Sequence, residues 1–492
     1  MAVIEPTVVV IGAGFGGIAT ALELRRRGIH RIIVLERAAG PGGVWQANQY
    51  PGARCDNPSA LYSLARHRFS WRGRYGDRAE IERYLSEVVS GTGLDDCIRY
   101  GQTVVAARFR DESSDWEIRT AQGELFRADY LISAVGQLAE PRLPELPGQG
   151  EFRGPQFHSA RWPDAFEVNG QRIGVVGTGA SAAQIVPWLQ RHAESVAVFQ
   201  RNPPWVLPKA DVRYSRGRAA LMAWRPVRVV ERAIVYALCE LLVLAVTSSP
   251  AGSRRVARAA RDHLHNQVAD PVLRRTLTPD YPLGGKRCVF SDEYYPALAA
   301  ANCEVVTDGI KAVTSTGIAT EAGEQLDLDA IVYCTGFAVT DFLATVEVHG
   351  RDGKSLADHW APGAKAYLGV TTSGFPNLFF VAGPNTNLTF GSVVFMLERQ
   401  ARYIGRLLST AARHGNATVE IRPEAEQAFA DWLLARFAGS VWSRVISPYR
   451  DRHGNVSSLW PRTMTRYWWS TRRPRVADFH PVRQRAPERV VS

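Results

Sequence analysis

The 492-residue chain has very little lysine. Only five of its 59 basic residues are lysines, and the other 54 are arginines. We interpret this bias as genomic base composition, because no zinc-finger spacing or RNA-binding signature accompanies it. The net charge of +11 therefore predicts no nucleic-acid partner, although a basic surface attracts phosphate-rich cofactors.

The chain also lacks closely spaced cysteine pairs, since none of its six cysteines forms a C-x-x-C motif. A thioredoxin-type redox centre and a zinc site are therefore not expected, and no other metal site is predicted. The scatter is typical of reduced, buried thiols in a cytoplasmic protein. The cysteines are Cys55, Cys97, Cys239, Cys288, Cys303 and Cys334.

Long apolar segments are missing as well. No signal peptide is expected, because the N-terminus enters a strand-like run at once. The longest apolar run, AIVYALCELLVLAV at 233–246, has 14 residues and contains Glu240. It is too short to span a bilayer, so we predict a buried or interfacial helix.

Two glycine-rich loops are the strongest features that the sequence does have. GAGFGG at 12–17 follows an apolar β-branched run and opens a helix, so Gly12, Gly14 and Gly17 fit G-x-G-x-x-G. These glycines permit a tight turn and bring the backbone close to a pyrophosphate at the helix N-terminus. Glu36 lies 19 residues past the last glycine, at the end of the next strand, and can bind ribose hydroxyls.

The second loop, GTGASA at 177–182, has the form G-x-G-x-x-A and lies in the same setting. Its second strand ends in Gln200 and Arg201 rather than in an acid. A ribose 2′-hydroxyl calls for a carboxylate, whereas a 2′-phosphate calls for a cation, so this site is predicted to take NADP. Two such sites in one chain indicate FAD plus NADPH, and without a redox cysteine pair oxygen is the natural electron acceptor.

These patterns predict an α/β fold with two Rossmann-like dinucleotide-binding domains, one for FAD and one for NADP, and a helical insertion. Strand patterns return at 303–313, 329–336 and 377–383, whereas 213–275 has helical spacing and is rich in arginine and alanine. The predicted order is the FAD-binding domain, first part, at 1–145; the NADP-binding domain, first part, at 146–211; the helical insertion for substrate access at 212–282; the NADP-binding domain, second part, at 283–339; and the FAD-binding domain, second part, with a C-terminal wrap at 340–492.

A third motif, FRGPQFHSARWPD at 152–164, lies between the two loops. It resembles the fingerprint of type I Baeyer–Villiger monooxygenases, within the class B flavoprotein monooxygenases. The matching residues are Phe152, Gly154, His158, Trp162 and Pro163. The resemblance extends over almost the whole chain, through GGVW at 42–45, YPGARCD at 50–56, PLGGKR at 282–287, YCTGF at 333–337, FPNLFFVAGPNTN at 375–387 and LWPRTMTRYW at 459–468.

The resemblance implies an FAD-containing, NADPH- and O₂-dependent enzyme that converts an apolar ketone to an ester or lactone through a C4a-peroxyflavin. Arg287 matches the family's active-site arginine, which would keep the peroxide anionic and polarise the carbonyl. Asp56 would orient Arg287 through charge-assisted hydrogen bonds. The fingerprint around His158 would be a linker that couples the movement of the two domains, and a purely structural role for His158 stays open.

The resemblance also assigns cofactor contacts by position. FAD contacts carry over to Glu36, Val44, Trp45, Gln46, Ala47, Asp56, Tyr62, Val104 and Val393. NADP contacts carry over to Arg54, Cys55, Gly177, Thr178, Gly179, Ala180, Ser181, Ala182, Ala183, Arg201, Asn202 and Lys286. The chain departs from the family where Asn202 replaces a threonine, Cys288 replaces a proline, and NLTFGS at 387–392 replaces a G-x-G-H-N-S run. The last two departures concern substrate preference.

Alternatives to ketone oxidation stay open. A protonated hydroperoxide is electrophilic, so the same fold could oxidise sulfur or nitrogen, although Trp162-Pro163 and Arg287 favour the ketone. A flavoprotein reductase without oxygen insertion is disfavoured, because a redox cysteine pair is missing. The oligomeric state cannot be inferred.

The helix at 233–246 also has two interpretations. Four arginines follow it between 254 and 261. It is either a buried core helix with a solvated basic neighbour, or it lines an entrance for a large apolar ketone, drawn in from a membrane surface by peripheral contact.

Overall fold

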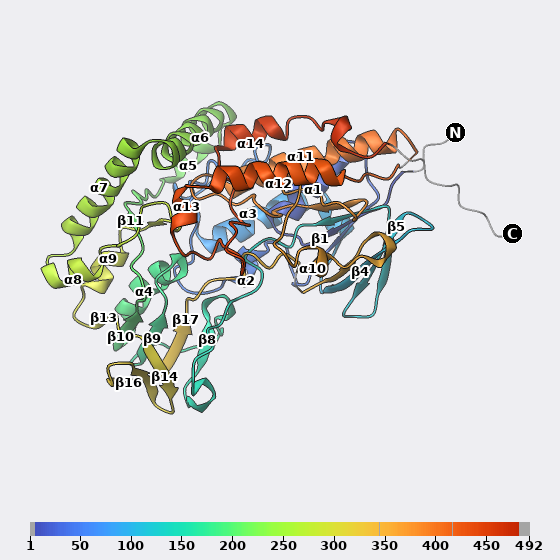
Figure 1. Cartoon of the computed structure of the whole chain (residues 1–492). Helices are drawn as coiled ribbons and strands as arrows, with labels where there is room; N and C mark the ends of the chain where they lie inside the picture. Colours follow the sequence, from blue (N-terminus) through green and yellow to red (C-terminus); the bar gives the residue numbers. More distant parts are fainter. Residues whose placement is uncertain (1–4, 344, 416, 482–492) are drawn as a thin grey trace.

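The computed structural model describes residues 5–343, 345–415 and 417–481 (Figure 1). Two five-stranded sheets form its centre, and all of their strands pair in parallel. The first has the order β19 (Leu378–Phe380), β7 (Tyr130–Ser133), β1 (Val8–Ile11), β2 (Ile32–Leu35) and β3 (Ile98–Arg99). The second has the order β13 (Cys303–Val306), β10 (Ser195–Phe199), β9 (Arg172–Val176), β17 (Ala330–Tyr333) and β8 (Gln156–His158). The predicted α/β class with two Rossmann-type sheets is confirmed.

The central strand of each sheet leads into a glycine loop and then into a helix. β1 is followed by α1 (Phe15–Arg26), and β9 is followed by α4 (Ala180–His192). The strands of these sheets are continuous apolar runs, such as VVVI in β1 and AIVY in β17, because both faces of each sheet are covered. On the first sheet, α1 packs against α11 (Val393–Ala412), and on the second α4 packs against α9 (Tyr294–Leu298).

The other strands form three smaller sheets, and the sequence did not indicate most of these strands. The strand pattern at 303–313 is two strands, β13 and β14, because the turn residues Asp308 and Gly309 interrupt it. A four-stranded sheet consists of β18 (Glu347–His349), β4 (Val104–Arg110), β5 (Asp115–Thr120) and β6 (Leu125–Ala128). A three-stranded one consists of β14 (Ile310–Thr314), β15 (Gly317–Thr320) and β16 (Gln325–Asp327), and β11 (Val206–Leu207) pairs with β12 (Val289–Phe290).

The segment predicted to be helical at 213–275 contains four helices. They are α5 (Arg216–Ala223), α6 (Arg225–Ser248), α7 (Pro250–Gln267) and α8 (Pro271–Thr276). The interpretation of 233–246 as a buried core helix is wrong, because Leu238 and Leu241 are about 60% exposed and only Val243 and Val246 of α6 are buried. Within the described ranges, no helix combines the length and apolarity needed to cross a membrane.

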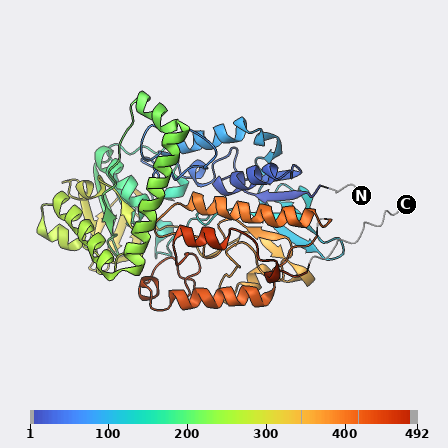
Figure 2. The same ribbon diagram turned by 90° about the horizontal axis from the view of Figure 1, so that it is seen from above.

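The remaining helices lie mostly in the C-terminal part, which packs back on the first sheet's helices. They are α2 (Val44–Ala47), α3 (Arg78–Gly91), α10 (Leu356–His359), α12 (Pro423–Phe437), α13 (Val441–Arg444) and α14 (Met464–Ser470). Figure 2 shows α6 running across the ends of α11 and α14. The boundaries of the predicted domains stay predictions.

Candidate active site

The first glycine loop brings α1 as close to β1 as glycine allows. Gly12 has φ +102°, and a Cβ there would lie 2.8 Å from the carbonyl oxygen of Ala134. A Cβ on Gly17 would lie 1.8 Å from the carbonyl oxygen of Gly12. The backbone N–H groups of the first turn of α1 can therefore approach a pyrophosphate, so this cradle fits FAD.

Glu36 and the residues around Trp45 surround this loop. The buried Glu36 carboxylate accepts hydrogen bonds from the backbone N–H of Ala13 at 2.6 Å and of Ala38 at 2.8 Å. Trp45 donates from Nε1 to the Tyr62 hydroxyl at 3.0 Å. Burial raises the pKa of Tyr62, so its phenol stays protonated. Glu36 is thus fixed where a ribose hydroxyl is expected.

The other residues predicted to contact FAD divide into two groups. Val44, Gln46 and Ala47 lie with Trp45 in α2, which follows Gly43, and a Cβ on Gly43 would lie 3.0 Å from the Cα of Gly14. Val393 begins α11, and the neighbouring Ser392 donates to the Leu61 carbonyl at 2.9 Å. The structure therefore brings the α2 residues near the loop and places Val393 beside the segment that contains Tyr62. The Val104 side chain is instead buried in the core, so that only its backbone could contact a cofactor.

The second glycine loop repeats the close approach on the second sheet. Gly177 has φ +108°, and a Cβ there would lie 2.5 Å from the carbonyl oxygen of Cys334. Gly179 caps α4, and Thr178 donates from its hydroxyl to the Asn202 carbonyl at 2.9 Å. The predicted contacts Ala180, Ser181, Ala182 and Ala183 form the first turn of α4, with Ala182 and Ala183 buried.

Two cations converge beside this loop. Lys286 donates from Nζ to Oδ1 of Asn202 at 3.0 Å. Asn202, which replaces the family's threonine, therefore provides a hydrogen-bond acceptor for the lysine. Burial and the charge of Arg201 lower the pKa of Lys286. Arg201 is exposed and makes no ion pair with any described residue. An anion would relieve the repulsion between the two cations, so the site fits the 2′-phosphate of NADP.

The segment 50–54 of the FAD side contacts helix α4, and the sequence did not indicate this contact. The Gln184 side chain, on α4, accepts from the backbone N–H of Arg54 at 3.1 Å and from the Tyr50 hydroxyl at 3.1 Å, and it donates to the Arg54 carbonyl at 2.9 Å. Arg54 also pairs with Asp211 at 2.9 Å. The only signal in the sequence is a polar residue that follows the small residues opening α4.

Arg287 and Asp56 form an ion pair that joins the residue after Lys286 to the residue after Cys55. Arg287 donates from Nη2 to both oxygens of Asp56 at 2.7 and 2.8 Å and from Nε at 3.0 Å. Its Nη1 donates to the Leu388 carbonyl at 3.3 Å. The Arg287 side chain is 33% exposed and that of Asp56 is 18% exposed. The guanidinium plane is therefore fixed while part of the cation stays accessible.

The electrostatic environment keeps Arg287 charged and keeps the neighbouring Tyr449 and Cys55 neutral. The charge of Asp56 raises the pKa of Arg287. Burial raises the pKa of the nearby Tyr449 to about 12 and also raises that of the Cys55 thiol. Tyr449 was not predicted, since it lies in a loop without a motif. Cys55 is thus a protonated thiol rather than a nucleophile.

The fingerprint residues pack around the second sheet and reach the connection between the sheets. His158 accepts at Nδ1 from the Ala160 N–H at 3.1 Å and donates from Nε2 to the Gly336 carbonyl at 2.9 Å. Burial lowers the pKa of His158, which favours this neutral form. A Cβ on Gly154 would lie 2.3 Å from the carbonyl oxygen of Asp329, and Trp162 packs edge-on against Phe157. Phe152 is buried in the same half, and Pro163 accepts at its carbonyl from the Phe166 N–H.

Comparison with known proteins identifies the class. Residues 9–216 match the family described as pyridine nucleotide-disulphide oxidoreductase. The chain is 37% identical to a Baeyer–Villiger monooxygenase of Pseudomonas aeruginosa, over 96% of this chain and 91% of the relative, and 38% identical to one of Streptomyces coelicolor, over 98% and 94%. It is 31% identical to a phenazine N-monooxygenase of Lysobacter antibioticus, over 86% and 85%.

Solved structures agree with these relatives. A cyclohexanone monooxygenase from Rhodococcus sp. Phi1 bound to NADP⁺ superimposes with a TM-score of 0.87 at 27% identity, covering 97% of this chain and all of that one. OTEMO in complex with FAD and NADP gives 0.87 at 27% identity, covering 96% and 99%. An oxidised steroid monooxygenase bound to NADP gives 0.86 at 29% identity, covering 96% and 99%.

The chain belongs to the Baeyer–Villiger monooxygenases. It is an FAD-containing enzyme that uses NADPH and O₂ to oxidise a small-molecule ketone to an ester or lactone. These relatives are monooxygenases rather than disulphide reductases, so oxygen is the electron acceptor. All six cysteines, which lie in the described part of the chain, are free thiols.

Proposed function

We propose that Arg287 is the catalytic cation of the oxygenation and that Asp56 is its positioning residue. The observation that carries this is the set of three hydrogen bonds that fix the guanidinium on Asp56. FAD, when bound and reduced by NADPH, supplies the oxygen activation. Arg287 then offers a fixed positive charge that favours an anionic oxidant and polarises the substrate carbonyl. In sum, ketone, O₂, NADPH and a proton give ester, water and NADP⁺.

On the NADP side, the proposed readers of the 2′-phosphate are Lys286 and Arg201, with Asn202 holding Lys286. Support comes from the closeness of the two cations, since the charge of Arg201 lowers the pKa of Lys286 and Lys286 donates to Asn202. The first turn of α4 would hold the pyrophosphate, and Arg54 and Cys55 would line the same cleft. On the FAD side, the residues predicted from the resemblance keep their proposed contacts, with Val104 acting through its backbone.

The proposed substrate is a large apolar ketone. The C-terminal half of α6 contributes Val243 and Val246 to an apolar cluster with Leu283 and Cys288, the residues that flank the loop of Arg287. A Cβ on Gly284 would lie 2.7 Å from Val246. The helical segment thus presents apolar groups to the catalytic loop. A cytoplasmic location and contact of this segment with a membrane surface are likewise proposals.

N-oxygenation is the second candidate, and the phenazine N-monooxygenase relative favours it. Oxygen transfer to nitrogen calls for a protonated, electrophilic oxidant. A cation fixed beside the flavin site works against that protonation, because it stabilises the anionic form. The Arg287–Asp56 pair therefore favours the ketone.

The test uses the FAD-loaded enzyme with methyl ketones of increasing length, a sulfide and an aromatic amine under ¹⁸O₂. Arg287→Ala should still bind FAD and be reduced by NADPH, but its labelled ester should fall at least about 100-fold, as on removal of an oxyanion-stabilising donor. Arg275→Ala, exposed on α8, is the matched control and should behave as wild type. Ester formation by Arg287→Ala at the wild-type rate would remove Arg287 from the mechanism, and a wild-type enzyme that labels only the amine would establish N-oxygenation.

A further inference from the structure

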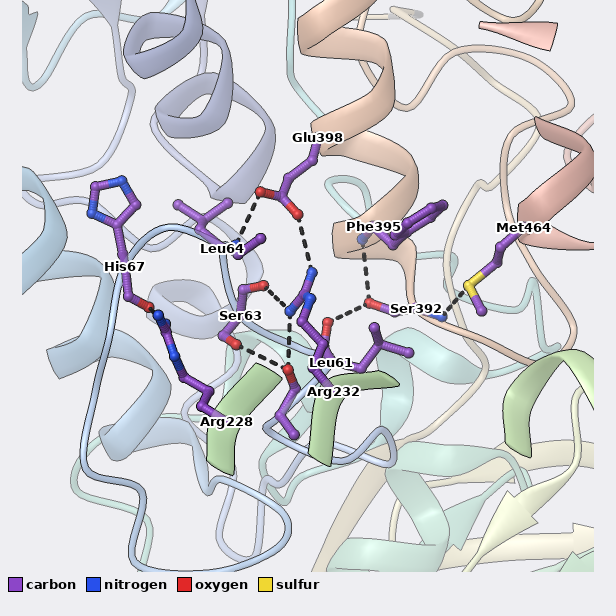
Figure 3. A network of polar contacts seen from close by, with 12 residues as sticks. Leu61, Ser63, Leu64, His67, Arg228, Arg232, Ser392, Phe395, Glu398 and Met464 are labelled. Atoms are coloured by element: carbon purple, nitrogen blue, oxygen red, sulfur yellow. Dashed lines mark hydrogen bonds and ion pairs between the residues drawn. The ribbon is translucent and has the colours of Figure 1, made fainter. Parts of the chain in front are cut away.

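α6 has its polar side chains on the face that packs against the protein. Arg228 donates to the His67 carbonyl at 2.8 Å, and Arg232 donates to the carbonyls of Ala60 and Ser63 at 2.9 and 2.8 Å (Figure 3). Arg232 also pairs with Glu398 of α11 at 3.1 Å, with both side chains less than one-fifth exposed. These polar contacts hold the N-terminal half of α6 against the FAD side of the molecule.

The same polar face continues into the second half of the helix. The Glu240 carboxylate accepts from the backbone N–H groups of Met464 and Thr465, at 2.7 and 3.1 Å, and so satisfies the start of α14. The Tyr236 and Thr465 hydroxyls share a hydrogen bond of 2.7 Å. Positions 228, 232, 236 and 240 recur every four residues, so they share one face of the helix.

The opposite face is apolar and exposed. Val230, Ile234, Leu238 and Leu241 are 59, 55, 59 and 62% exposed, and their spacing of four, four and three residues places them in one row. Of the seventeen exposed large apolar side chains among the described residues, eight lie between 221 and 244. From Val230 to Leu241 the row covers twelve residues of α6, so it extends over about 17 Å. Exposed apolar side chains that lie together in this way mark an interaction site.

Basic side chains lie at both ends of this row. Residues 213–275 contain twelve arginines and four acidic residues, so this segment carries +8 of the chain's net +11. Two of the four acids, Glu231 and Glu240, are half-buried and hydrogen-bonded within the protein. The exposed arginines nearest the row are Arg216, Arg218 and Arg225 at its start and Arg254, Arg255 and Arg258 just past its end.

We propose that the outer face of α6 binds the surface of an anionic lipid bilayer. Apolar residues along a helix, with cations at its flanks, match the acyl boundary and the phosphate headgroups of such a surface. A second copy of the chain fits less well, because a two-fold contact through α6 would bring the arginines of one copy close to those of the other. The proposal does not depend on the oxygenation chemistry, and it would place the enzyme where apolar ketones dissolve.

The test measures co-sedimentation of the FAD-loaded enzyme with vesicles of phosphatidylcholine alone or mixed with phosphatidylglycerol. Wild type should bind the mixed vesicles and leave phosphatidylcholine vesicles largely unbound. Leu238→Glu with Leu241→Glu should weaken binding by at least about tenfold, because leucine burial is lost at both positions. Each of Arg225→Ala, Arg254→Ala and Arg255→Ala should weaken binding about fivefold.

Two control variants test whether the loss of vesicle binding is specific to α6, and a dimer is the competing explanation. Leu125→Glu, 53% exposed on β6, and Arg119→Ala, exposed on β5, should bind as wild type does. All variants should keep wild-type FAD content and turnover of a water-soluble ketone. Absence of wild-type binding, or equal binding by the Leu238 and Leu241 variant, would overturn the proposal. A wild-type dimer in sedimentation velocity that this variant dissociates would overturn it in favour of a second copy.

Discussion

At the scale of single residues, Arg201 is expected to bind the 2′-phosphate of NADP. It forms no ion pair with any described residue. Arg201→Ala should raise the KM for NADPH by about ten- to a hundredfold, the range of one charged hydrogen bond, and should leave the KM for NADH nearly unchanged. Steady-state kinetics with both coenzymes measure this. Arg191→Ala, exposed on α4, is the control. Equal losses for the two coenzymes would show that Arg201 does not read the 2′-phosphate.

His359 is expected to make stability depend on pH. Burial lowers its pKa from 6.5 to about 4, and the charges of Lys354 and Lys365 add to this, although the Glu426 carboxylate 4.0 Å away opposes it. The unfolded chain therefore binds the proton first, so stability is full above about pH 6.5 and falls as pH drops towards 4. The loss amounts to about 3 kcal/mol.

This expectation can be measured by chemical denaturation between pH 7 and pH 4 on the FAD-loaded enzyme. His359→Gln should flatten the acid side of the stability profile relative to wild type. His192→Gln, exposed on α4, should not. Parallel profiles for wild type and His359→Gln would show that this histidine is not the group that titrates.

At the scale of elements, the buried Arg232–Glu398 pair connects α6 to α11. Glu398→Gln should reduce the free energy of unfolding by about 3–5 kcal/mol, because it leaves a largely buried guanidinium without its counter-charge. Glu87→Gln breaks the exposed Arg83–Glu87 pair of α3 and should cost less than about 1 kcal/mol. Denaturation midpoints compare the two. Similar small effects would mean that α6 is held by its other contacts.

At the scale of the whole molecule, the two sheets are joined by two chain segments that run side by side. Pro141 and Phe337 pair across them, and the Gly336 carbonyl accepts from the Arg142 N–H at 2.9 Å and from His158. His158 thus connects the fingerprint to the junction. A proton-transfer role does not fit, because both of its ring nitrogens are engaged with the backbone.

His158→Ala should loosen this junction without removing a group that touches either cofactor cradle. The ratio of hydrogen peroxide to ester per NADPH consumed should rise severalfold, while FAD content stays at the wild-type level. Peroxide and ester are quantified together in one assay, with His453→Ala, exposed on a loop, as the control. An unchanged ratio would leave His158 with packing as its only role.

The sequence predicted the features that are encoded locally. Each glycine loop, its strand and its helix lie within about thirty consecutive residues, so their geometry follows from the order of residues alone. The same holds for Arg201, which lies at the end of a strand. The short antiparallel strands of the β18–β4–β5–β6 sheet were not predicted, because pairing depends on partners distant in the chain, such as Glu347 and Ala106.

Only the tertiary structure decided the pairings and the orientations. Arg287 and Asp56 are separated by 231 positions, and composition or periodicity could not bring them together, although the resemblance to a family named both. Periodicity shows that α6 has an apolar face and a polar face, but it does not say which one meets the protein. In α6 the polar face does, because Glu398, the carbonyls around Ser63 and the start of α14 supply partners that no stretch of local sequence contains.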